Sequence, residues 1–129
     1  MELYTGLKGL AEVEVTAANT AAALGSGALP VFSTPSMVAL MEKAALESVQ
    51  PFLAEGQGTV GTLLDIRHLA ATPVGLHVRA ESELTEIDRR RLVFRVEVFA
   101  GAEKIGEGTH ERFIIDNERF MAKAEAKRA

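Results

Sequence analysis

Alternation of apolar and polar residues predicts a set of strands, and their order is the first indication of the architecture. One short strand is expected at 12–16, and longer ones at 60–69, 75–87, 91–100 and 104–116. The strand at 91–100 shows the pattern most clearly, with one face formed by Leu92, Phe94, Val96 and Val98. Residues 88–90 and 101–102 fit hairpin connections between consecutive strands.

Between the first and second strands the apolar spacing changes to that of a helix. Thr34 is a good N-cap and Pro35 a good first helical residue. The helix is expected to run to about Ala54 and to stop at Gly56. Its apolar side is formed by Met37, Val38, Met41, Ala44, Ala45 and Phe52. Glu42 falls at the edge of this apolar side, away from the centre of the polar side.

One strand, one long helix and four consecutive strands make an α+β layout. The helix is the only element long enough to cover the apolar face of an antiparallel sheet. Gly106 and Gly108 lie two apart on the last strand, so their missing side chains would let the helix approach the sheet closely. Residues 17–29 are rich in Ala and Gly and predict a loop, whereas 117–129 are charged and helix-prone.

Composition narrows the classes of protein that fit. The 129 residues, 47% of them hydrophobic, suit a single domain over 1–129. The net charge of −4 and the lack of a basic stripe with aromatics argue against a nucleic-acid partner, and 89–91 is expected to be a solvated turn. No apolar run reaches the roughly 20 residues of a membrane span, and no leader pattern is found, so we expect a cytoplasmic protein without a membrane partner.

Three residues supply a hydroxyl, a carboxylate and an imidazole: Thr34, Glu42 and His68. These groups are the parts of an acyl-transfer site. Alternation along 60–69 gives a helix-facing row of Val60, Thr62, Leu64, Ile66 and His68. His68 then ends the row that faces the core, where it could meet Thr34 or Glu42, within one chain or across a dimer. The chain has no cysteine and no metal-ligand spacing, so neither a thiol nucleophile nor a metal is expected.

Each of these residues also has a purely structural interpretation. Thr34 could serve only as an N-cap, Glu42 could extend from the helix edge into solvent, and His68 could bond to backbone at a strand end. His77 is expected to point to solvent, whereas His110 shares a face with the two glycines of the last strand. On the residues alone, the acyl-transfer site is one interpretation of a small α+β domain.

Several segments together resemble the fluoroacetyl-CoA thioesterase family of hotdog-fold proteins. They are residues 34–42, 60–62, His68, 71–75 and 106–112. The resemblance covers about 32–123, with the motifs in the same order and spacing, and is weakest over the first 30 residues. It implies an antiparallel sheet wrapped around a long helix. It also implies homodimers whose sheets join edge to edge with two active sites at the interface, and a dimer of dimers as a further form.

The resemblance implies hydrolysis of a short acyl-CoA thioester, with no cofactor because CoA is part of the substrate. By match, Thr34, Glu42 and His68 would be catalytic, Gly61 would lie at the acyl pocket, and Arg112 would contact a CoA phosphate. In this hypothesis His68 is the general base and Glu42 orients it or activates water. Attack by Thr34 and direct attack by water both stay open. The alternatives are a non-catalytic acyl-CoA-binding or regulatory module, and a dehydratase of the same fold, which the threonine argues against.

Overall fold

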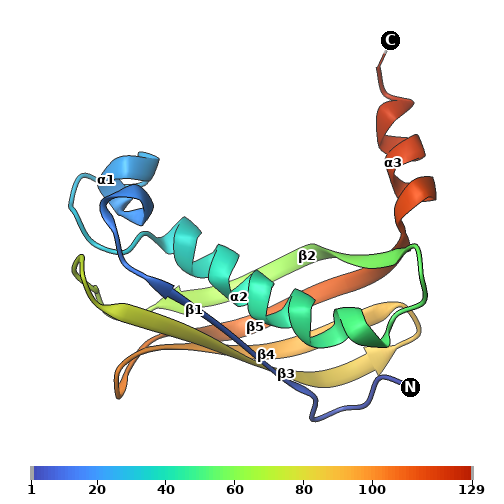
Figure 1. Cartoon of the computed structure of the whole chain (residues 1–129), viewed down its shortest axis with the longest axis horizontal. Coiled ribbons are helices and arrows are strands. Elements are labelled where there is room, and N and C mark those ends of the chain that lie inside the picture. Colours follow the sequence, from blue (N-terminus) through green and yellow to red (C-terminus); the bar gives the residue numbers. More distant parts are fainter. Residues whose placement is uncertain (1, 129) are drawn as a thin grey trace.

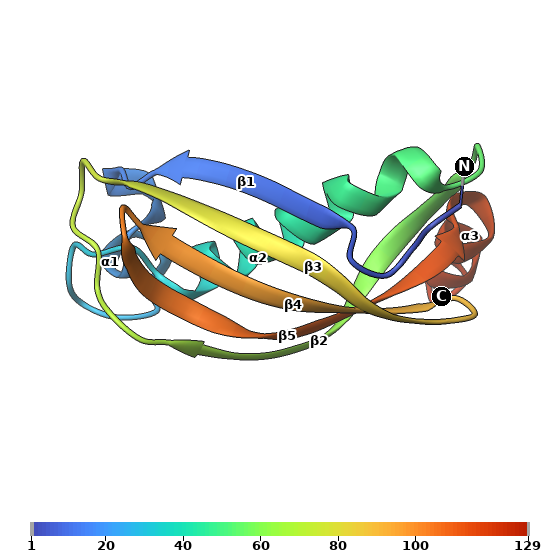
Figure 2. The same cartoon turned by 90° about the horizontal axis from the view of Figure 1, so that it is seen from below.

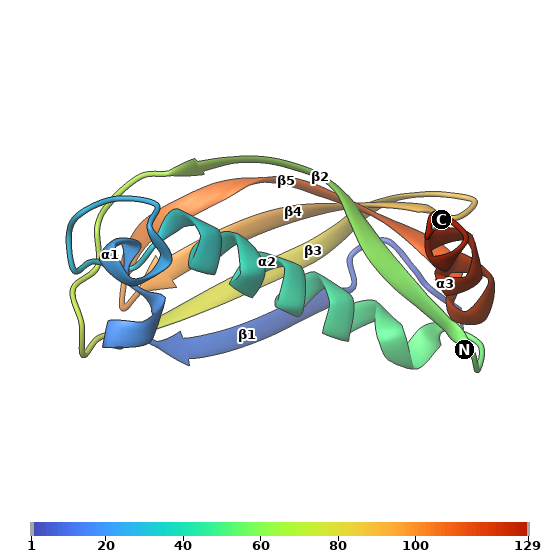
Figure 3. The same ribbon diagram turned by 90° about the horizontal axis from the view of Figure 1, so that it is seen from above.

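The computed structural model describes residues 2–128 and contains one antiparallel sheet with a long helix lying across it (Figure 1). The strands are β1 (Lys8–Glu14), β2 (Gln57–His68), β3 (His77–Asp88), β4 (Arg91–Ala100) and β5 (Glu103–Asp116). Their order in the sheet is β1-β3-β4-β5-β2, which places β2 at one edge. The helix α2 (Thr34–Val49) lies along one face of the sheet, as the view from above in Figure 3 shows. The predicted α+β architecture is therefore confirmed.

The long helix is shorter than expected. It ends at Val49 and passes into a short 3₁₀ turn, η2 (Gln50–Phe52), whereas the sequence predicted continuation to about Ala54. Pro51 explains the difference, because proline lacks the N–H that an α-helical hydrogen bond requires. No helix among residues 2–128 is long and apolar enough to cross a membrane.

The smaller elements lie at the two ends of the molecule. The expected loop at 17–29 contains a 3₁₀ turn, η1 (Ala17–Asn19), and one helical turn, α1 (Ala21–Leu24). At the opposite end of the long axis, the helix α3 (Asn117–Glu125) follows β5 and projects from the body (Figures 1 and 2). The first strand begins earlier than predicted, because pairing with β3 extends it from Glu14 back to Lys8.

The core lies between α2 and the inner face of the sheet. The buried helix residues are Met37, Leu40, Met41, Ala44, Ala45 and Val49. A Cβ on Gly106 would lie 2.5 Å from the sulfur of Met37, so the predicted close approach of the helix is confirmed at this glycine. The same expectation is wrong for Gly108, where a Cβ would meet the backbone of Asp65 and Ile66 on β2 instead.

Candidate active site

The start of α2 presents the hydroxyl of Thr34. Ser33, one residue earlier than predicted, is the N-cap, and its Oγ accepts a hydrogen bond of 3.1 Å from the N–H of Ser36. Thr34 is therefore the first helical residue and Pro35 the second. Because capping does not use the Thr34 hydroxyl, its Oγ1 can lie 2.7 Å from Nδ1 of His68. The expectation that Thr34 caps the helix is wrong, and the correction leaves this hydroxyl available for chemistry.

His68 ends β2 beside the helix start. Its Nδ1 meets Thr34, while its Nε2 is buried and has no hydrogen-bond partner within residues 2–128. Burial lowers the pKa of His68 from its usual value of 6.5, partly opposed by the backbone of Ala70. The imidazole is therefore neutral near pH 7, which is the form that can accept a proton from a hydroxyl or a water.

The Thr34–His68 pair lines a pocket of about 390 Å³. Its walls come from the α1–α2 connection and from the chain just after β2, and they consist of Ala21, Ser26, Val31, Phe32, Leu69, Ala70 and Ala71. Most of these side chains are apolar. Thr34 and His68 are thus the groups with acid–base chemistry in a pocket that otherwise suits a small apolar group.

A bulge in β2 decides which residues face the helix. The register with β5 shifts between Gly61 and Leu63, so Thr62 is the extra residue. Gly61 pairs with Arg112, and beyond the bulge Leu64 pairs with a residue on the same inner face. The predicted row is therefore right for Leu64, Ile66 and His68. It is wrong for Val60 and Thr62, because one inserted residue reverses the alternation.

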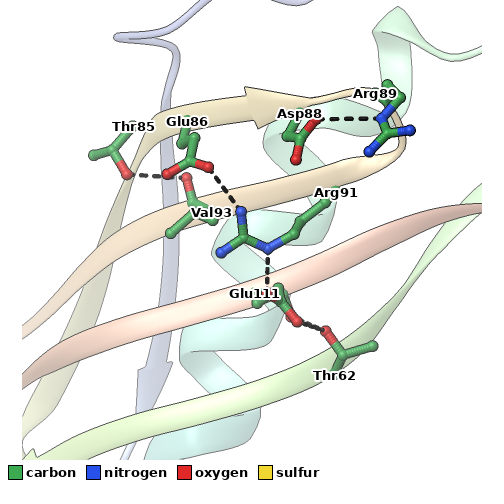
Figure 4. Close-up of polar contacts among 8 residues, drawn as sticks. All are labelled: Thr62, Thr85, Glu86, Asp88, Arg89, Arg91, Val93 and Glu111. Atoms are coloured by element: carbon green, nitrogen blue, oxygen red, sulfur yellow. Dashed lines mark hydrogen bonds and ion pairs between the residues drawn. The ribbon is translucent and has the colours of Figure 1, made fainter.

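On the outer face of the sheet, a network of hydrogen bonds stabilises this bulge (Figure 4). The Thr62 hydroxyl donates to Glu111 over 2.6 Å, and Nε of Arg91 donates to the other carboxylate oxygen, also over 2.6 Å. These hydrogen bonds lower the pKa of Glu111. Arg91 also bonds Glu86 over 2.7 Å, so it belongs to a strand network and not to the solvated turn expected at 89–91. With Thr62 held outward, Gly61 faces the helix.

Glu42 lies against Gly61, not against the Thr34–His68 pair. It follows Thr34 by eight residues, which is about 12 Å along a helix. A Cβ on Gly61 would lie 2.5 Å from Oε2 of Glu42, and the same oxygen lies 3.4 Å from Nη1 of Arg112. The Glu42 side chain remains 38% exposed. The chain therefore places these residues in two separate groups: the Thr34–His68 pair, and a group formed by Glu42, Gly61 and Arg112.

Arg112 is held by groups on β2 and β5. Its Nε donates to the Thr59 hydroxyl over 2.8 Å, and its Nη2 donates to the Thr59 carbonyl over 3.0 Å. The side chain is only 7% exposed. This burial contradicts the expected contact with a CoA phosphate, because the guanidinium is already committed to partners inside the protein. Its remaining contact with the candidate site is the one from Nη1 to Oε2 of Glu42.

His110 supports Arg112, a role that its predicted place on the inner face did not indicate. Its Nδ1 lies 2.8 Å from the carbonyl oxygen of Leu63 and its Nε2 lies 3.2 Å from Nη1 of Arg112. A carbonyl only accepts, so the proton sits on Nδ1 and Nε2 accepts from the guanidinium. Burial lowers the pKa of His110, which keeps this acceptor in place at neutral pH. His77 is exposed, as predicted.

Comparisons with known proteins identify the family. The model of the fluoroacetyl-CoA-specific thioesterase family matches residues 15–118. The fluoroacetyl-CoA thioesterase of Streptantibioticus cattleyicolor is 45% identical over 97 residues, which are 75% of this chain and 70% of that protein.

Solved structures extend the likeness to the whole fold. A structure of the fluoroacetyl-CoA thioesterase FlK superposes with a TM-score of 0.93 at 36% identity, and covers 100% of both chains. A thioesterase superfamily member from Thermus thermophilus has a TM-score of 0.88 at 30% identity, covering 95% of this chain and 91% of its own. A hot-dog-like protein from Thermanaerovibrio acidaminovorans, at 18% identity, shares the fold with a TM-score of 0.87 over 97% and 93% of the two chains. This chain therefore belongs to the fluoroacetyl-CoA-specific thioesterase family and has the hotdog fold.

Proposed function

We propose that this protein hydrolyses the thioester of a short acyl-CoA to the free acid and CoA, with Thr34, Glu42 and His68 as catalytic residues. The observation that carries the proposal is the 2.7 Å contact between the Thr34 hydroxyl and a neutral histidine at the wall of an apolar pocket. Membership in a thioesterase family favours hydrolysis over a module that only binds acyl-CoA.

In the proposed reaction, His68 accepts a proton from the attacking group. That group is either the Thr34 hydroxyl, which would form an acyl-enzyme that water then hydrolyses, or a water that Thr34 and Glu42 position. In both routes the C–S bond breaks and the proton held by His68 passes to the departing CoA thiolate. The carbonyl oxygen gains negative charge in both routes, and the positive end of the α2 dipole lies beside Thr34 to stabilise it. The routes differ in whether the enzyme becomes acylated. Intact-mass spectrometry of enzyme quenched during turnover distinguishes them.

The proposed active site needs two copies of the chain. β2 is an edge strand, so one side of its backbone is available to pair with a second β2. An antiparallel pair with its axis at Asp65, and with Thr62 as the extra residue of the bulge, would set His68 opposite Gly61 of the partner subunit. Both positions face the helix side of the sheet. Glu42 of the partner subunit, which lies over that glycine, would then reach the Thr34–His68 pair and complete the site.

The proposed substrate carries a small acyl group. The pocket is lined largely by apolar side chains such as Phe32 and Leu69, and most of its remaining wall is alanine. We expect a housekeeping enzyme that clears small acyl-CoAs, and the fluorinated substrate named for its relatives is one candidate among them.

Release of free thiol from a panel of acyl-CoAs tests this function. The panel contains acetyl-, fluoroacetyl-, propionyl- and phenylacetyl-CoA, and we expect turnover of the small members with His68→Ala as the inactive control. Preference for the bulky phenylacetyl group would contradict the proposed small acyl substrate. An absence of turnover on every thioester, with CoA still bound, would replace the proposal by the binding-module alternative.

Gly61→Ala is expected to lower kcat/KM about tenfold or more, because misplacement of a catalytic group by an ångström has effects of that size. The new Cβ would meet Oε2 of Glu42 at 2.5 Å and displace the carboxylate. The fold should persist, since the obstructing atom ends a flexible side chain. Gly58→Ala on the same strand is the control, because its Cβ would meet the Asn117 side chain instead, and its kcat should stay within about twofold of wild type. Equal kcat/KM for Gly61→Ala and wild type would remove Gly61 from the site.

A further inference from the structure

The C-terminal helix α3 contributes nothing to the core of its own chain. None of its residues is buried, and both Phe120 and Met121 are exposed. It lies at the end of the long axis opposite α1 and the start of α2, in all three views (Figures 1, 2 and 3). The helix continues directly from β5. Because it packs so little on its own chain, stabilisation of the core does not account for its presence.

A groove of about 450 Å³ runs between α3 and the turn that joins β3 to β4. Its apolar floor is formed by Ile114, Ile115 and Phe120, and its charged rim by Arg90, Asp116, Arg119 and Lys123. Arg90 pairs with Asp116 over 3.7 Å. Arg119 and Lys123 form no ion pair with any residue in the described range 2–128. The groove thus offers two uncommitted cations beside apolar surface, on a chain whose net charge is −4.

The basic side chains of α3 follow helical spacing. Arg119 and Lys123 are separated by four residues, so they lie on one side of the helix, while Glu118 and Glu125 fall on another side. Guanidinium and ammonium groups are the usual protein partners of phosphate, and an apolar floor suits a planar base. The chemistry of the groove therefore matches a nucleotide that carries phosphates.

We propose that this groove binds the phosphate-bearing nucleotide end of CoA, and that it serves the active site of the partner copy. The inference rests on the proposed acyl-CoA hydrolysis and on the proposed pairing of β2. In its own chain, α3 is at the far end of the molecule from the start of α2, the helix that begins at Thr34 (Figure 1).

The β2 pairing explains how α3 reaches the partner's pocket. The N–H of Asn117 donates to the Gly56 carbonyl over 2.9 Å, and a Cβ on Gly58 would touch the Asn117 side chain, so α3 begins beside the start of β2. In the proposed register, the start of β2 lies beside the end of the partner subunit's β2, where the chain continues into residues 69–71 of the pocket wall. The nucleotide would lie on α3 of one copy while the thioester reaches His68 of the other.

The double charge reversal Arg119→Glu/Lys123→Glu tests the groove. We expect KM for acetyl-CoA to rise about tenfold or more with kcat within about twofold, because both lost contacts are to phosphates distant from the thioester. Hydrolysis of the acetyl thioester of N-acetylcysteamine, which lacks the nucleotide, should be unchanged. The fold should be unaffected because α3 buries no side chain. Lys8→Glu/Arg79→Glu, on the β1 side of the sheet, is the matched control.

The results distinguish failure of the groove assignment from failure of the proposed hydrolysis. An unchanged KM for acetyl-CoA in the variant would overturn the groove assignment while hydrolysis stands. If wild type cleaves neither thioester, calorimetric titration with adenosine 3′,5′-bisphosphate still tests whether the groove binds the nucleotide. Binding to wild type that the double variant loses supports the groove, and equal or absent binding overturns it.

Mixed dimers test whether the groove acts on the partner's pocket. A dimer of one Glu42→Gln protomer and one His68→Ala protomer has a single complete site in the proposed arrangement. In this dimer the α3 that faces the complete site belongs to the His68→Ala protomer. The charge reversal should therefore raise KM when the His68→Ala protomer carries it. It should leave KM unchanged when the Glu42→Gln protomer carries it. The opposite result would place the groove beside the pocket of its own chain.

Discussion

The variant His68→Ala should lower kcat/KM for the best acyl-CoA by about 100-fold or more, the lower end of the 10²–10⁴-fold range for general-base catalysis. The imidazole is the group that can take a proton from the attacking oxygen, and its Nδ1 already lies 2.7 Å from the Thr34 hydroxyl. The stability of the variant should change little, because the hydrogen bond to Thr34 that it loses lies at an exposed position. Thiol release and thermal unfolding measure the two quantities.

The pH dependence of the wild-type enzyme adds a second readout. Burial lowers the pKa of His68 below 6.5, so the neutral base persists at mildly acidic pH. We expect kcat/KM to be constant above pH 6.5 and to fall only below it. His77→Ala, at an exposed position, should leave rate and profile unchanged. Retention of more than about a tenth of wild-type kcat/KM by His68→Ala would exclude this residue as the base.

The elements that alternate regularly were the ones the sequence predicted best. The bounds of β4 match the prediction because each inner position, from Leu92 to Val98, is apolar and the strand has neighbours on both sides. The helix start was misplaced by one residue because Ser33 and Thr34 are both good caps, and proline is accepted at either of the next two positions. The hydrogen bond that the N–H of Ser36 donates to the Ser33 hydroxyl identifies Ser33, and not Thr34, as the cap.

The candidate site was predictable only where the local pattern continued unbroken. His68 was placed correctly because Leu64 and Ile66 preserve the alternation after the bulge. The bulge at Thr62 left no local signal, since it depends on an outer-face hydrogen bond to Glu111, 49 residues away in the chain. The contact between Glu42 and Arg112 spans 70 residues and requires the folded sheet.

The separation of the three proposed catalytic residues follows from these contacts. Arg112 is fixed to Thr59 at two points and supported by His110, and it holds Glu42 over Gly61. A carboxylate held in this way is not free to swing about 12 Å along the helix toward His68 of its own chain. If all three residues act in one reaction, a second protomer must supply one of the two groups.

Mixed dimers test this conclusion directly. Glu42→Gln and His68→Ala homodimers should each retain about a tenth or less of wild-type activity, the loss expected when a positioned acid–base group is removed. After subunit exchange at equal concentrations, half of the dimers combine the two variants, and each has one intact composite site. Activity should therefore recover to about a quarter of wild type. A titration of one variant into the other, followed by thiol release, measures the recovery.

The matched control combines Thr34→Ala with His68→Ala. These residues form one of the two groups within a single chain, with 2.7 Å between them. A mixed dimer of these two variants therefore contains no intact site, and mixing should restore nothing. If native mass spectrometry shows the Glu42→Gln/His68→Ala heterodimer while activity stays at the level of the separate homodimers, the composite site is wrong. Any contribution of Glu42 would then be to the active site of its own chain.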